Sequence, residues 1–187
     1  MDGIRSQTSS EASARHRPPP PSSVRVLGID PGLHLAGYAC VDLGSGDPEP
    51  TLVEAGVLRL RSKASLAYRL GQLHDDLEEL LDELRPQRMA VEQVFSHPSY
   101  ARTAILLGHA RGVVLLAAQR RALAIDEIVP AAVKKSLTGN GRATKLQMQT
   151  AVMGQCGLAE PPDPPDVADA IAIALCGARR LLFSLPA

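Results

Sequence analysis

The sequence contains no tryptophan, and aromatic residues make up only 3% of it. Leucine, valine, isoleucine and alanine must therefore supply the buried surface. Hydrophobic residues account for 45% of the chain, which indicates a folded protein rather than a disordered one. The 187 residues are enough for one domain with a proper core.

Paired cysteines are also missing. Cys40, Cys156 and Cys176 are odd in number and widely spaced, so they indicate neither a disulfide framework nor a zinc site. Free buried thiols in a reducing cytosol are the simplest interpretation. No apolar run approaches the roughly 18 residues of a spanning helix, and the N-terminus lacks the apolar region of a signal peptide. We expect a cytoplasmic protein.

An excess of either sign of charge is absent as well. The formal net charge is zero, which neither favours nor excludes nucleic acid as a partner. The distribution along the chain is uneven, because residues 99–150 contain eight basic and two acidic residues. Every formal charge between residues 71 and 84 is acidic. This asymmetry predicts one face suited to phosphates.

The first 23 residues are rich in serine, arginine and proline and contain almost nothing to bury. They predict a disordered N-terminal tail over residues 1–23, followed by one domain over residues 24–187. An Arg- and Ser-rich start also mimics a transit peptide, but Asp2 and Glu11 count against that interpretation.

Hydrophobic periodicity and turn residues predict an α/β domain, in which a five-stranded mixed sheet is flanked by helices. Thr144 is a plausible N-cap, and the leucines of residues 65–84 form one apolar stripe. Strands are expected over residues 24–30, 35–43, 51–60, 87–94 and 122–129, and helices over 65–84, 102–121, 130–136, 144–155 and 166–182.

Acidic residues end two of these strands and begin the last helix. Asp30 closes the first strand just before a Pro-Gly turn, and Glu92 lies near the end of the fourth. Asp166 and Asp169 share one face at the helix start. Taken alone, such aspartates often serve their own turn or the helix N-terminus. A carboxylate beside an apolar run is costly unless a cation meets it, so we expect the fold to gather all four.

Four gathered carboxylates are suited to the hydrolysis of phosphodiesters. That reaction needs an activated water and neutralisation of the developing charge, and two divalent ions about 3.5–4 Å apart supply both. Carboxylate ligands without cysteine favour Mg²⁺ or Mn²⁺ over zinc. The pattern predicts a metal-dependent nuclease.

Six short segments around the acidic and basic residues follow one another in a particular order. They are residues 26–32 (VLGIDPG), 90–95 (AVEQVF), 108–112 (GHARG), 133–135 (VKK), 138–145 (TGNGRATK) and 166–174 (DVADAIAIA). In this order, and over about residues 24–180, the chain resembles the RuvC-type Holliday junction endonucleases. Each segment alone is a weak signal, whereas the ordered set is a strong one.

The resemblance implies an RNase H-like fold, a homodimer, and paired nicking of four-way DNA junctions in recombination and repair. It implies two Mg²⁺ ions per active site, with Mn²⁺ as a substitute, and a branch-migration helicase complex as a partner. It assigns catalysis and metal binding to Asp30, Glu92, Asp166 and Asp169. The long N-terminal tail is a departure, since the family usually lacks it.

Basic residues near these segments are candidates for DNA contacts. Lys134 and Lys145 match lysines that the family uses near the cleaved phosphate, although most lysines are simply solvated. The glycines around Asn140 let backbone amides approach phosphate closely. Arg111 and Arg142 are expected to contact the DNA backbone without reading bases.

Phe95 follows Glu92 by three residues and precedes a loop. An aromatic residue at this place in the family stacks on unpaired junction bases, and such stacking tolerates any sequence. Packing in the core is the usual fate of phenylalanine, so both roles stand at this point.

Three other functions compete with a junction nuclease. A sugar-kinase or actin-like ATPase has a similar phosphate loop but needs two such domains, for which 187 residues leave no room. An RNase H-like nuclease that processes ribosomal RNA precursors is the nearer alternative, and the loop 138–145 and the run 92–112 favour the junction enzyme over it. A junction-binding protein without catalysis would not need four acids.

Overall fold

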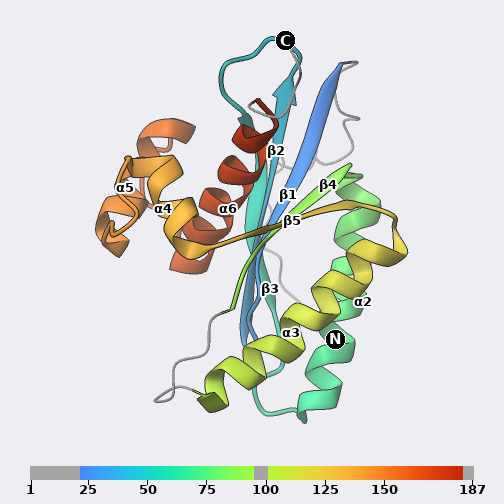
Figure 1. Cartoon of the computed structure of the whole chain (residues 1–187). Helices are drawn as coiled ribbons and strands as arrows, with labels where there is room; N and C mark the ends of the chain where they lie inside the picture. The colour runs from blue at the N-terminus through green and yellow to red at the C-terminus, as the bar shows by residue number, and fades with distance from the viewer. Residues whose placement is uncertain (1–21, 95–100, 183–187) are drawn as a thin grey trace.

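A five-stranded sheet with helices on both faces forms the structure (Figure 1). The computed structural model describes residues 22–94 and 101–182. The sheet order is β3-β2-β1-β4-β5, with β2 antiparallel to β1 and β3, and β4 parallel to β1 and β5. The predicted fold class is confirmed. The strands are β1 (Ser23–Asp30), β2 (Leu35–Gly44), β3 (Thr51–Arg59), β4 (Arg88–Glu92) and β5 (Ala124–Ile128).

The helices divide between the two faces of the sheet. In Figure 1, α2 and α3 lie together on one side, while α6 covers the other side with α4 and α5 packed outside it. The two faces enclose separate apolar clusters, so Leu27 and Ile29 of β1 face α2 and α3, whereas Val26 faces α6. The helices are α2 (Leu66–Leu84), α3 (Ala101–Arg120), α4 (Pro130–Thr138), α5 (Lys145–Cys156) and α6 (Pro165–Leu182).

Most predicted boundaries hold within two residues, and the differences have local causes. The fourth strand ends at Glu92 rather than at residue 94, although the Gln93 amide still donates to the Ile128 carbonyl at 2.9 Å. The fifth strand begins at residue 124 because Ala122, with φ 53°, turns the chain out of α3. Thr144 is the N-cap of α5 as expected, in a capping box with Gln147. The three cysteines are free as expected, but only Cys40 and Cys176 are buried, whereas Cys156 is half-buried.

Helix α6 lies unusually close to β1 and β2. A Cβ atom on Gly28 would stand 2.4 Å from the backbone nitrogen of Ala174, and one on Gly37 would stand 2.2 Å from the Asp166 carbonyl oxygen. Only glycine admits such contact, because any side chain would push the helix away. These two glycines therefore fix the height of α6, and of the acids it carries, above the sheet.

A buried ion pair locks the opposite, amino edge of β1. Arg25 is 2% exposed, and its Nε donates to Asp42 Oδ1 of β2 at 2.7 Å. Its Nη1 also donates to the Leu84 carbonyl at the end of α2, at 2.9 Å. One side chain thus joins two strands and a helix, and satisfying the buried guanidinium in this way offsets its desolvation.

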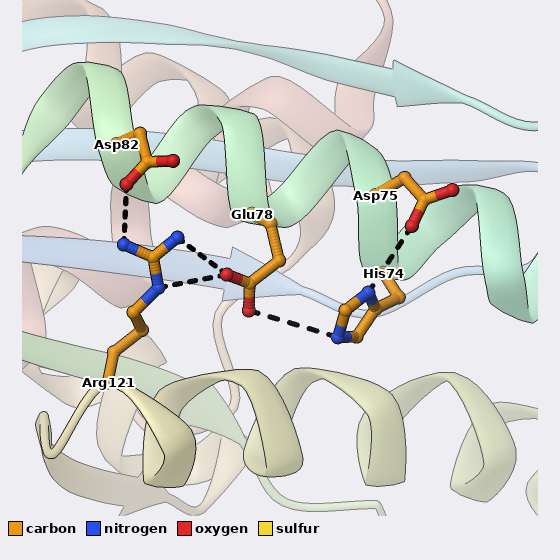
Figure 2. Close-up of polar contacts among 5 residues, drawn as sticks. All are labelled: His74, Asp75, Glu78, Asp82 and Arg121. Carbon is orange, nitrogen blue, oxygen red and sulfur yellow. Dashed lines mark hydrogen bonds and ion pairs between the residues drawn. The ribbon is translucent and has the colours of Figure 1, made fainter.

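The predicted single basic face is only partly correct. Arg121 follows α3 and pairs with Glu78 and Asp82 of the acidic helix α2, and Glu78 also contacts His74 (Figure 2). Part of the basic stretch and part of the acidic stretch therefore neutralise each other between α2 and α3. Such exposed pairs stabilise the fold little, but they remove Arg121 from any phosphate-binding surface.

Helix α3 is long and apolar. By length and composition it is long enough to cross a membrane, which corrects the expectation that no stretch reaches that size. It packs on α2 and β5 through Ala110, Val114 and their neighbours, while Ile105 is 63% and Leu116 is 53% exposed. The helix therefore belongs to the layered fold on one side and presents apolar side chains on the other.

Candidate active site at the carboxyl edge of the sheet

The parallel pairing of β1 and β4 brings Asp30 and Glu92 to one edge of the sheet. Each is the last residue of its strand, and Ile29 pairs with Val91 immediately before them. Two strands that run parallel in register end together, so the two carboxyl groups lie on neighbouring strand ends.

Helix α6 adds two further acids from above the sheet. Asp166 and Asp169 belong to its first two turns, and the Asp166 carbonyl rests against Gly37. Gly37 is the β2 residue paired with Asp30. The close seating of α6 thus delivers its acidic start to the end of β1, and all four acids meet at the edge where they were expected.

The four acids influence one another electrostatically. Burial, followed by the charges of Asp169, Glu92 and Asp166, raises the pKa of Asp30 from 3.8 to about 7. Burial and Asp169 raise the pKa of Glu92, and burial is the largest cause of the raised pKa of Asp169. Carboxyl groups that resist ionisation together form a site with a deficit of positive charge.

The donor set fits a hard divalent cation. All four side chains offer carboxylate oxygens, which Mg²⁺ and similar ions prefer. Within residues 22–94 and 101–182, no three acidic, histidine or cysteine side chains converge tightly enough to enclose an ion.

Two lysines lie beside this acidic cluster. The Nζ of Lys145 is 3.5 Å from Asp169 Oδ2, and Lys145 lowers the pKa of Asp169 against the effect of burial. Lys134 acts in the same direction on Glu92 and Asp169. The α5 cap at Thr144 fixes where Lys145 begins its helix, so the basic loop stands next to the acids.

The remaining predicted contacts differ in their placement. Arg142 is exposed, and its amide donates to Asn140 Oδ1 at 2.9 Å within the loop. Arg111 is half-buried and makes contacts within the chain, since its Nε donates to the Glu92 carbonyl at 3.3 Å and it pairs with the exposed Glu127. Sequence reasoning missed this internal role, for which a basic residue on a helix gives no signal. Phe95 lies outside the described residues.

A five-stranded mixed sheet with an acidic cluster at its carboxyl edge and lysines beside it is the arrangement of an RNase H-like nuclease. The chain belongs to the family of the crossover junction endodeoxyribonuclease RuvC, whose family model matches residues 26–177.

Relatives are similar over most of their length. The crossover junction endodeoxyribonuclease RuvC of Rhodopirellula baltica is 48% identical over 158 residues, which cover 84% of this chain and 88% of the relative. The protein of the same name from Halorhodospira halophila is 48% identical over 157 residues, covering 83% and 90% respectively. The structure of T. thermophilus RuvC in complex with Holliday junction substrate matches with a TM-score of 0.78 at 33% identity, over 86% of this chain and 96% of that one.

Membership in this family defines the chemistry. The chain is an endodeoxyribonuclease, a hydrolase of DNA phosphodiester bonds, and the family depends on divalent metal. The RNase H-like fold is as expected. These relatives give no support to the alternative of ribosomal RNA processing.

Proposed function

We propose that the chain resolves Holliday junctions by paired, symmetrical nicking of four-way DNA during recombination and repair. Asp30, Glu92, Asp166 and Asp169 are the proposed catalytic and metal-binding residues. The supporting observation is their meeting at one sheet edge, where burial and mutual charge raise the pKa of Asp30 to about 7. The junction-bound structure of the T. thermophilus relative favours the four-way substrate.

The proposed cofactor is Mg²⁺, two ions per active site, with Mn²⁺ as a substitute. Two such ions activate water and neutralise the charge of phosphodiester cleavage, and oxygen ligands select them over softer metals. The four acids would bind the ions. Their positions are fixed by the fold, because two lie at strand ends and two on a helix that packs directly against glycine. The raised pKa values of Asp30, Glu92 and Asp169 indicate that the edge favours a cation.

Basic and aromatic side chains are the proposed DNA contacts. Lys134 and Lys145 stand beside the acids and balance the phosphate charge there. Arg142, exposed on the adjoining loop, contacts the DNA backbone. Phe95, three residues after Glu92 in the sequence, is the proposed stacking contact with unpaired junction bases, and packing in the core is its alternative role. For Arg111 the internal contacts favour a supporting role, because its guanidinium holds the carbonyl of Glu92.

The proposed assembly is a homodimer with two-fold symmetry. Two symmetrical cuts require two active sites, and a C2 dimer is the simplest way to supply them. The apolar side chains of α3 that remain exposed, above all Ile105 and Leu116, favour that helix as part of the interface. A branch-migration helicase complex is the proposed partner at the junction.

The proposed organisation is a tail over residues 1–23 and a nuclease domain over residues 24–187, in the cytoplasm. The family model begins at residue 26 and so leaves the tail outside the matched region.

The decisive experiment is nicking of a synthetic four-way junction. The protein is incubated with the junction and with a linear duplex of the same sequence, with Mg²⁺, with Mn²⁺ and with EDTA. We expect paired nicks at symmetrical positions of the junction only, and only with the divalent ions. Equal cleavage of the linear duplex would contradict junction resolution, and cleavage in EDTA would contradict the proposed metal site.

A further inference from the structure

A second group of cations lies at the carboxyl edge, in the connection between β3 and α2. This 59–63 segment carries Arg59, Arg61 and Lys63, all of them exposed. Within the described part of the chain none of the three forms an ion pair with a carboxylate. Cations without an acidic partner leave a positive surface open to an anion.

The segment is held in place rather than loose. Gln72 of α2 donates from Nε2 to the Arg59 carbonyl at 3.0 Å and accepts from the Arg61 amide at 3.0 Å. The Arg61 guanidinium also lies over the Tyr68 ring, 5.5 Å from its centroid. The Leu60 amide donates to the His34 carbonyl at 2.9 Å, in the turn that follows Asp30. The Gln72 side chain thus clamps the backbone on both sides of Leu60, and the Leu60 amide ties the segment to the turn beside the active site.

Leucine burial orients the cations. Leu58 and Leu60 are buried in the cluster under α2 and α3, so alternation puts Arg59 on the face that carries α6. Arg61 instead reaches toward α2, over Tyr68. The segment therefore presents charge on both sides of the sheet edge.

The segment lies at the same edge of the sheet as the acids, at a separation that a duplex arm can span. Strand β3 runs parallel to β1 and ends at the same edge, two strands away. Two strand spacings are about 10 Å, which is about three base-pair steps along DNA. Lys134 and Lys145 reach the acids from the α4 and α5 side, whereas the 59–63 segment lies on the β3 side. The acids stand between two cationic surfaces.

We propose that the 59–63 segment, clamped by Gln72, is a second phosphate-binding surface that holds the duplex arm leaving the active site on the β3 side. This rests on the proposed junction-resolving function and adds a surface to it. The contact is with phosphates, because arginine and lysine at a strand end offer donors without a groove-reading element. It fixes the register of the arm and carries no base preference.

The test measures binding of a labelled four-way junction in EDTA between about 50 and 200 mM salt. The variant is Arg59→Gln/Arg61→Gln/Lys63→Gln. The matched control, Arg85→Gln/Arg120→Gln/Arg180→Gln, removes the same charge from exposed sites at the opposite edge of the sheet. Both proteins thus change net charge equally, and thermal melting checks that each is folded.

We expect the salt slope of the first variant to become shallower by about 0.9 for each phosphate that the segment no longer neutralises. Its affinity should fall roughly fivefold to tenfold for each such phosphate at 0.1 M salt, whatever the arm sequence. The control should keep the wild-type slope. Equal slopes in variant and control would overturn the proposal.

Gln72→Ala tests the clamp without changing any charge. It should weaken junction binding in the wild-type background and add nothing in the triple variant, because both changes act through one surface. Additive losses of affinity would show that Gln72 acts elsewhere and would overturn the clamp. The wild-type nicking assay distinguishes a failure of the proposed junction-resolving function from a failure of the second phosphate-binding surface. If wild type resolves junctions while the triple variant binds like its control, only the second surface fails.

Discussion

Asp30 combines burial with three acidic neighbours, and these raise its pKa to about 7, so ionising it without a cation is costly. The pKa values of Glu92 and Asp169 are raised for related reasons, with Lys134 and Lys145 opposing the shift. A site of this kind is destabilising by itself and becomes favourable once a divalent ion binds. The proposed catalytic residues therefore reduce the stability of the metal-free protein.

The raised pKa of Asp30 predicts how metal-free stability depends on pH. The unfolded chain releases this proton near 3.8 and the folded chain near 7, so the folded state holds more protons across that window. The free energy of unfolding should therefore fall as the pH rises from about 4 to about 7. Urea denaturation in EDTA at several pH values measures it.

Asp30→Asn provides the comparison. This variant cannot ionise, so in EDTA above pH 7 it should be more stable than the wild type, and the divalent ion should stabilise it less. Asp75→Asn, on the exposed surface of α2, should stay within about 0.5 kcal/mol of wild type. A wild-type protein whose metal-free stability rises across the same pH window would refute the raised pKa.

The acids themselves should be indispensable for cleavage. Amide substitution at Asp30, Glu92, Asp166 or Asp169 should reduce nicking by more than the roughly 10–100-fold typical of removing a ligand's supporting partner, because an amide does not balance metal charge. Junction binding should persist, since phosphate contacts supply most of the affinity. Gel assays of nicking and of binding measure the two effects on one substrate. Normal nicking by one variant would remove that acid from the site.

Substitution of the two lysines beside the acids should affect both the cleavage rate and the salt dependence of binding. Lys134→Ala and Lys145→Ala should slow cleavage and lower the salt slope of binding by about one unit each. Lys135→Ala is the matched control, because Lys135 is an exposed neighbour on the same helix as Lys134. Single-turnover cleavage against salt concentration separates them, and an equal reduction in Lys135→Ala would point to a general effect of charge.

At the scale of the elements, hydrophobic periodicity was sufficient to predict the strands of the sheet and the helices that cover its two faces. It was also sufficient to place the acids at strand and helix ends, because those ends follow from where apolar runs stop. The seating of α6 was not foreseeable. Gly28 and Gly37 must be glycine because the backbone of α6 lies against them. The sequence pattern of their own strands carries no information about that contact.

That seating gives a prediction. Gly28→Ala should destabilise the protein by about 1–3 kcal/mol or more, because its Cβ meets backbone that no rotamer change can move. Gly71→Ala, in the exposed part of α2 with open space around it, should be neutral or stabilising by up to about 1 kcal/mol. Equilibrium urea unfolding of both variants measures the difference. Equal effects would show that α6 shifts freely over β1.

The exposed side of α3 gives the prediction about assembly. Ile105→Asp/Leu116→Asp should convert a dimer into monomers, because buried charge without a partner is costly at an apolar interface. Leu146→Asp changes an exposed leucine on α5 and should leave the dimer intact. Sedimentation at micromolar concentration measures both. A fully active wild-type monomer would contradict the proposed interface.

Over the whole molecule, charge is arranged by the fold rather than by the sequence order. Basic residues of the stretch 99–150 lie in different places. Arg121 pairs with acids of α2, whereas Lys134 and Lys145 lie at the carboxyl edge of the sheet. The cations of the 59–63 segment join that edge from another basic stretch of the chain, since residues 55–74 contain four basic residues and no acidic one. Counting charges along a chain predicts a partner with phosphates but not the surface that meets it, because pairing between distant segments decides which charges remain.

The position of α6 also sets when the enzyme acquires its chemistry. Its acids are the last parts of the site to leave the ribosome, since α6 begins at residue 165 and β1 ends at residue 30. When all five strands have been synthesised, the nascent chain contains only two of the four carboxylates, Asp30 and Glu92. The apolar face of β1 that packs against α6 is then still uncovered. With the four acids as the proposed catalytic residues, the newly made chain therefore has a complete site only after its final helix has docked.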